Sequence, residues 1–76
     1  MATPAEQHLA EAEQHLAEAE ARIVRQRMRI SELVAAGHDT GAAEAVLATL
    51  LVNLDALHKH RANLLKEVAA ERAARP

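Results

Sequence analysis

The sequence predicts an all-α fold, an antiparallel two-helix hairpin that pairs with a second copy to form a four-helix bundle. Glycine occurs only at Gly37 and Gly41, and the two prolines stand near the chain ends. The segments on either side, about residues 5–36 and 41–74, are rich in Ala, Leu, Glu, Arg and Gln, which favour helices. Both segments carry a seven-residue apolar repeat, which is typical of coiled coils. The 76 residues are therefore expected to form a single helical-hairpin domain, 1–76.

The first predicted helix opens with a perfect seven-residue repeat. Ala-Glu-Gln-His-Leu-Ala-Glu stands at residues 5–11 and again at 12–18. At this spacing, two heptad positions form an apolar seam. The seam residues are Leu9, Ala12, Leu16, Ala19, Ile23, Gln26, Ile30 and Leu33. A second apolar line on the flank of the helix consists of Ala10, Ala17, Ala21, Val24, Met28 and Ala35. A designed chain would also repeat in this way, but the irregular Gln26, Asn53 and Asn63 favour a natural one.

The turn between the helices is predicted at Gly37-His38-Asp39-Thr40-Gly41. Gly37 suits the left-handed residue that closes a helix, and Asp39 or Thr40 can cap the first amides of the next helix. A connection this short makes the helices antiparallel neighbours, so that residues whose numbers add up to about 78 lie opposite one another.

The second predicted helix carries a matching seam and a wide apolar stripe. Its seam residues are Ala43, Leu47, Leu50, Leu54, Leu57, Arg61, Leu64 and Val68. Apolar side chains flank this line at Val46, Leu51, Leu65 and Ala69. A stripe wider than a two-stranded seam indicates that the helix has more than one neighbour.

Charge also favours the antiparallel alignment. The first half of the first helix is acidic, with Glu6, Glu11, Glu13, Glu18 and Glu20. The second half of the second helix is basic, with Lys59, Arg61, Lys66, Arg72 and Arg75. Arg61 lies in the seam, and Glu13 or Glu20 is its expected partner. Exposed ion pairs contribute at most about 1 kcal/mol each, so these charges select the alignment more than they stabilise it.

An isolated hairpin leaves the second apolar lines uncovered. We therefore expect either a homodimer or docking on a larger protein complex, in a non-catalytic interaction or structural role. The partner is expected to cover residues 23–36 and 43–57, with both chain ends free to fray. The predicted interaction residues are Ile23, Val24, Met28, Ile30, Leu33, Val46, Leu47, Leu50, Leu51, Leu54 and Leu57.

Composition argues against several other functions. Cysteine and aromatic residues are absent, so disulfides, thiolate metal sites and base stacking are not expected. The net charge of −2 gives no general attraction to nucleic acid or anionic lipid. No catalytic constellation or phosphate-binding loop is visible, so we predict no enzyme activity, no cofactor and no small-molecule substrate. The longest apolar runs, 33–36 and 45–52, are short of the roughly 20 residues of a membrane span, and no signal peptide is evident, so a cytoplasmic protein is expected.

Two alternatives involve charged groups. Arg22, Arg25 and Arg29, with Arg27 beside them, form a basic patch that could bind RNA or DNA from a hairpin dimer. The competing interpretation is a solvated helix face or a contact for an acidic protein.

The second alternative is a metal site. Asp55-x-x-His58 resembles half of a bundle-type carboxylate–histidine site, with His15, Glu18 or Glu20 opposite. The competing interpretation is a set of solvated histidines, and no metal is expected.

The segment from about residue 15 to 68 resembles a group of small proteobacterial helical-hairpin proteins with no established activity. The similarity consists of Arg25-x-x-x-Arg29-Ile30-x-x-Leu33, the turn Gly37-His38-Asp39-Thr40, and Arg61-x-x-Leu64-Leu65-Lys66-Glu67. The Gly-His-Asp-Thr turn is its most specific element. The resemblance implies a bacterial source and a helical hairpin, and it implies nothing about mechanism.

Overall fold

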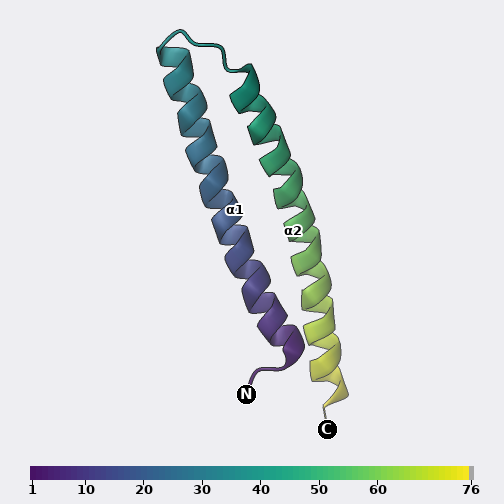
Figure 1. The fold of residues 1–76 in the computed structure, drawn as a ribbon. Coiled ribbons are helices and arrows are strands. Elements are labelled where there is room, and N and C mark those ends of the chain that lie inside the picture. The colour runs from purple at the N-terminus through teal and green to yellow at the C-terminus, as the bar shows by residue number, and fades with distance from the viewer. Residues whose placement is uncertain (76) are drawn as a thin grey trace.

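The structure, a computed structural model that describes residues 1–75, is a hairpin of two long helices. Helix α1 spans Pro4–Ala35 and helix α2 spans Gly41–Ala74. The helices lie side by side and antiparallel, with both termini at the end opposite the turn (Figure 1). We call this the open end. The predicted all-α hairpin is confirmed, and α1 lies one residue nearer the N-terminus than predicted.

A capping box starts α1. The Thr3 hydroxyl accepts a hydrogen bond from the amide of Glu6 at 3.1 Å, and the amide of Thr3 donates to the Glu6 carboxylate at 3.1 Å. Pro4 occupies the first helical turn, where its missing N–H costs nothing. The Thr3 hydroxyl also donates to the Glu71 carboxylate of α2 at 3.3 Å. Hydrogen bonds within α1 and from Thr3 to α2 therefore join the two helices at the open end.

The turn closes α1 with a glycine in the left-handed conformation, as predicted. Gly37 has a φ of 73°, and the amides of Gly37 and His38 donate to the carbonyls of Val34 and Leu33 at 3.0 and 2.9 Å. This pair of bonds is a Schellman motif, which satisfies the last carbonyls of the helix. The Asp39 carboxylate then accepts from the Gly41 amide at 3.1 Å.

Of the two candidate caps for α2, Asp39 is the residue that contributes a side chain. Thr40 stands at the N-cap position, but its hydroxyl makes no capping bond. Its carbonyl accepts the first helical hydrogen bond from the amide of Glu44 at 2.8 Å. The short turn therefore joins the helices with its polar groups satisfied on both sides.

The two seams meet as the heptads predict, but burial is uneven along the hairpin. The buried residues are Ala5, Ala12, Leu16, Ile23, Leu64 and Val68. Most of them lie toward the open end. The seam residues near the turn are only half-buried, and they include Ile30, Leu33, Leu47, Leu50, Leu54 and Leu57. The hairpin therefore covers the turn-proximal half of its own seam incompletely.

The register differs from the predicted one by about two residues, which is less than one helical turn. Arg61 lies 3.8 Å from Glu13, one of the two partners predicted for it. The helices end at Ala35 and begin at Gly41, so the centre of reversal is nearer 38 than 39. At the open end, Arg72 and Arg75 both approach Glu6, at 3.8 and 3.6 Å.

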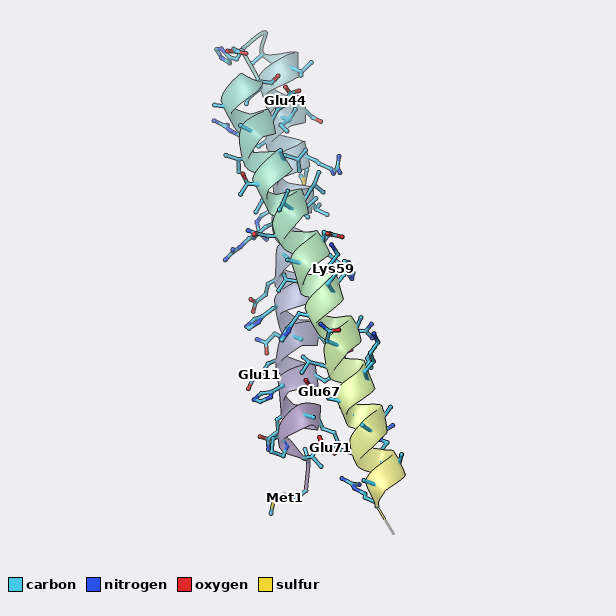
Figure 2. All side chains as sticks on the ribbon, turned by 90° about the vertical axis from the view of Figure 1, so that its right-hand side faces the viewer. Met1, Glu11, Glu44, Lys59, Glu67 and Glu71 are labelled. Atoms are coloured by element: carbon cyan, nitrogen blue, oxygen red, sulfur yellow. The ribbon has the colours of Figure 1, made fainter. Side chains whose placement is uncertain are left out.

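The molecule is a long single layer. It measures 63 × 19 × 12 Å, and its radius of gyration is 17.6 Å, whereas a compact domain of this length would have about 11 Å. Its accessible surface is 5574 Å², whereas a compact monomer of this mass would expose about 4,500 Å². Figure 2 shows side chains projecting freely around both helices. About 1,000 Å² of surface is therefore exposed beyond what a globular monomer leaves in water.

Candidate interaction surface

The two sides of the helix pair differ in chemistry. A groove on one side is lined by Leu16, Ala17, Glu20, His58 and Arg61, together with Glu13. A groove on the opposite side of the seam has the polar rim His15, Glu18, Arg22, Asn53 and His60 over an apolar floor. The heptad positions of the two sets lie on opposite flanks of the seam. We call the second side the polar face.

The first side becomes apolar toward the turn. Val24 lies one heptad from Ala17, and Leu51 lies one heptad from His58, so both continue the same side of the pair. Val24 is 57% exposed and Leu51 is 39% exposed. We call this side the apolar face. Its members are Ala17, Val24, Ala48, Leu51 and Leu65, whereas Met28 and Val52 are exposed at outward positions, away from the partner helix.

The structure divides the predicted interaction residues into two groups. Val24, Met28, Val46 and Leu51 are exposed to solvent. Ile23 is buried between the helices, and the remaining six are half-buried in the seam. Those six are Ile30, Leu33, Leu47, Leu50, Leu54 and Leu57. Most of the predicted set therefore holds the hairpin together, and the free surface is smaller than predicted.

Two exposed apolar residues lie within the predicted contact ranges, 23–36 and 43–57, but were not named among the predicted interaction residues. Val34 is 64% exposed and Val52 is 70% exposed, the latter more than any residue of the predicted set. Val52 follows Leu51 and lies one heptad before Lys59, at an outward position. The heptad already places Val52 outside the seam. The two predicted apolar lines, however, run through residues next to Val34 and Val52 and do not include them. Large apolar side chains at such outward positions are the signal that identifies a face needing cover.

The basic patch lies on or beside the polar face. Arg22 lines the polar groove, and Arg29 approaches Glu32 at 4.0 Å, with both side chains more than 60% exposed. Arg22 and Arg25 form no ion pair within residues 1–75. The patch is therefore two free guanidinium groups with a third that is partly neutralised.

The groups proposed for a metal site do not come together. His58 lines the groove beside Glu20, whereas His15 and Glu18 line the polar groove across the seam. Asp55 is held by Lys59 at 2.9 Å. Within residues 1–75 no three His, Asp or Glu side chains are placed to hold a metal ion. Of the three residues considered opposite His58, only Glu20 shares its groove, whereas the heptad positions of His15 and Glu18 place them on the other flank of the seam.

Helix α2 is also apolar enough for a membrane. By length and composition it could span a bilayer, since an 18-residue window reaches a mean hydropathy of 1.2. None of that window is buried in the hairpin. The sequence prediction considered only uninterrupted apolar runs and so did not detect this property. A helix that is apolar nearly all round needs cover from protein or lipid.

The turn residues serve the chain reversal, and they form no binding site with neighbouring side chains. His38 and Asp39 are exposed, and Asp39 is committed to the Gly41 amide. The chain matches no protein-family model, and neither a curated protein nor a solved structure matches it significantly. Its function is therefore inferred from the geometry of the hairpin.

Proposed function

We propose that this chain is a non-catalytic interaction module, a helical hairpin that pairs with a second copy through its apolar face to form a four-helix bundle. The observation that carries the proposal is the exposure of Val24 and Leu51 on one side of a hairpin whose own seam is half-covered nearby, with Met28 and Val52 exposed at outward positions beside them. A second copy packed on this side would bury the exposed apolar face and would also cover the half-buried residues of the seam.

The exposed area is large enough for a stable pair. A standard interface removes about 800 Å² from each partner. The hairpin exposes about 1,000 Å² more than a compact monomer of its mass. A chain of this size also seldom gains more than about 3–5 kcal/mol from its own core. Self-association therefore supplies the stability that a single layer lacks.

A second copy is a simpler partner than a different protein. In a two-fold pair, one apolar face covers another of the same kind, so no further surface is required. Docking on a larger complex would use the same face, and it is the competing form of the module.

Sedimentation velocity between 1 and 100 µM tests the proposal. We expect a dimer of the intact chain that becomes monomeric when Leu51 or Val24 is changed to Glu, because each change places a charge in the interface. The matched control is Thr49→Glu, an exposed position of α2 outside the apolar face. A well-folded monomeric wild-type chain at 100 µM would overturn the homodimer.

The apolar composition of α2 requires a second control. Co-sedimentation with neutral and anionic phospholipid vesicles measures whether the chain prefers lipid to itself. We expect the dimer to stay in the supernatant. Complete capture by neutral vesicles, with loss of the dimer, would show that the apolar face is a lipid surface.

A second candidate, nucleic-acid binding, is favoured by the unpaired Arg22 and Arg25 beside the polar face, which the proposed dimer leaves open. Binding of structured RNA or duplex DNA at low salt should then weaken with added salt and with alanine at Arg22, Arg25 and Arg29. Lys66→Ala is the control. No shift of either nucleic acid at low salt would exclude this function.

A further inference from the structure

We infer that the two copies pack with their turns at opposite ends, α1 against α1 and α2 against α2, about a two-fold axis that crosses the apolar face at Val24 and Leu51. This inference rests on the proposed dimer and adds its orientation. It follows from the register of the hairpin and from where the charges of the apolar face stand along it.

The register places Val24 and Leu51 at one level. In the polar groove, Ala19 of α1 lies near the level of Ala56 of α2, and Arg22 lies near the level of Asn53. Counting from Arg22 and Asn53, Val24 and Leu51 are each two residues nearer the turn. A two-fold axis through this level brings the exposed apolar residues of one copy against those of the other.

On α1, opposite charges stand on either side of this level. Arg27 lies toward the turn and Glu20 toward the open end, seven residues apart and hence on one strip of the helix. Arg27 lies in an outer groove with Val24 and Met28, and Glu20 lies in the groove of Ala17 and His58. Neither has an ion-pair partner within residues 1–75. Antiparallel packing of α1 on α1 places each Arg27 opposite Glu20 of the other copy.

On α2 the same axis gives a second match. Glu44 lies seven residues from Leu51 toward the turn, and His58 and Lys59 lie seven and eight residues from it toward the open end. Figure 2 labels Glu44 near the turn and Lys59 near the middle of α2. Antiparallel packing of α2 on α2 therefore places Glu44 opposite His58 of the other copy and near Lys59, whose ammonium group also pairs with Asp55 at 2.9 Å. The same axis therefore pairs Arg27 with Glu20 on α1 and Glu44 with His58 on α2. The axis was placed by the level of Val24 and Leu51, and the pairing on α1 does not by itself require the pairing on α2.

The opposite orientation brings like charges together. If the turns lay at the same end, α1 would pack on α2 of the other copy with equal levels facing. Glu20 would then face Asp55, which is paired with Lys59 of its own helix at 2.9 Å, at two symmetric places, because Glu20 and Asp55 lie at one level in this register. Carboxylates placed opposite each other disfavour an interface. That orientation would also leave Arg27 facing Ala48, without a carboxylate.

A charge exchange tests the inference. Arg27→Glu and Glu20→Arg should each weaken the dimer about tenfold, because each creates two like-charge contacts. The double variant should recover most of the loss. Arg25→Glu makes the same charge change outside the apolar face and should leave the dimerisation constant nearly unchanged. Single variants without effect, or a double variant no better than the singles, would overturn the orientation.

A distance between the turns gives an independent measurement. The chain has no cysteine, so His38→Cys carries a single nitroxide label at an exposed site. Double electron–electron resonance between the two labels of the dimer should give a distance of about 40 Å. Each label lies 14 residues from the two-fold axis at Val24, and the two spans together make about 28 residues of helix at 1.5 Å each. A dimer with turns within about 20 Å would overturn the orientation while leaving the proposed function intact. A monomer would overturn both.

Discussion

At the scale of single residues, the chain reversal depends on Gly37. Its φ of 73° lies in the left-handed region, and no atom stands within 4 Å of where a Cβ would be. An added methyl group therefore meets no neighbour, and its whole cost comes from the backbone conformation. Gly41 differs, because it is the first residue of α2 and a Cβ there would touch only the Asp39 carboxylate at 3.5 Å.

This contrast predicts that Gly37→Ala destabilises the hairpin by about 1 kcal/mol, whereas Gly41→Ala is neutral or slightly stabilising. Urea denaturation followed by circular dichroism at one fixed protein concentration measures both. Gly37→Asn is the control, since asparagine tolerates this region better and should lose less than alanine. Equal stability of the two alanine variants would contradict the role of the turn.

The cap at Thr3 predicts a pH effect at Glu6. Hydrogen bonds from the backbone and side chain of Thr3, assisted by Arg75 and Arg72, hold the pKa of Glu6 below its usual range. A carboxyl whose pKa is lowered on folding stabilises the fold above its unfolded pKa, and this stabilisation is lost as the pH falls through the folded pKa. The ionised Glu6 should therefore contribute at neutral pH and cease to do so in acid.

Thermal melts of the wild type and Glu6→Gln test this effect. The wild type should melt higher at pH 7, and the difference should close below about pH 4 as the carboxyl is protonated. Glu11→Gln, at an exposed residue that forms no ion pair within residues 1–75, is the control. A difference that stays constant down to pH 3 would show that Glu6 acts through its shape and not its charge.

Residue identities differed in how well they could be predicted from the sequence. The left-handed Gly37 follows from a local rule and was predicted, and Glu13 is one of the two partners that the antiparallel register predicted for Arg61. The capping box was also written in the sequence as Thr-x-x-Glu, but the N-terminus was considered only as a possible signal peptide. The metal alternative failed for His15 and Glu18 because it matched residues only by their level along the hairpin, whereas their heptad positions lie across the seam from His58.

At the scale of the helices, heptad periodicity determined nearly everything about the fold. The repeat placed both helices and their seams, because a period of seven leaves one face that another helix can cover. It did not determine the register, which differs from the prediction by about two residues. Register depends on where α1 closes and α2 begins, and small changes at Ala35 and Gly41 shift every facing pair.

The uneven burial of the seam predicts where substitutions in α2 are most costly. Leu64 is 4% exposed and packs in the tighter half of the hairpin. Leu64→Ala should therefore cost about 2–4 kcal/mol, which is a large part of the stability of so small a domain.

The neighbouring Asn63→Ala provides the matched control. Asn63 is exposed, and alanine has the higher helix propensity, so this variant should be as stable as the wild type or slightly more so. Urea denaturation measures the free energy of unfolding of both variants and of the wild type. A loss of stability as large for Asn63→Ala as for Leu64→Ala would contradict the placement of the seam.

At the scale of the whole molecule, partner and role were the least predictable. Local sequence rules predict the helices and the turn. The partner, by contrast, depends on the apolar surface that the two helices of the hairpin leave exposed. The sequence placed Ile30 and Leu47 in the seams and Val24 and Leu51 on the flanks, but it listed all four as interaction residues, whereas the structure leaves only Val24 and Leu51 exposed. The excess area of about 1,000 Å² then follows from the single-layer shape, which no residue pattern reports directly.

This shape predicts that folding and assembly are coupled. If the second copy supplies the missing cover, the melting temperature should rise with protein concentration, because association stabilises only the folded chain. A tenfold increase in concentration should raise it by about 3–6 °C for a pair of chains of this length. Leu51→Glu should melt at a lower temperature that is independent of concentration, since its monomer has no partner to lose. A wild-type melting temperature that stays constant from 2 to 200 µM would mean that the single layer is stable alone and that its apolar face is reserved for a different protein.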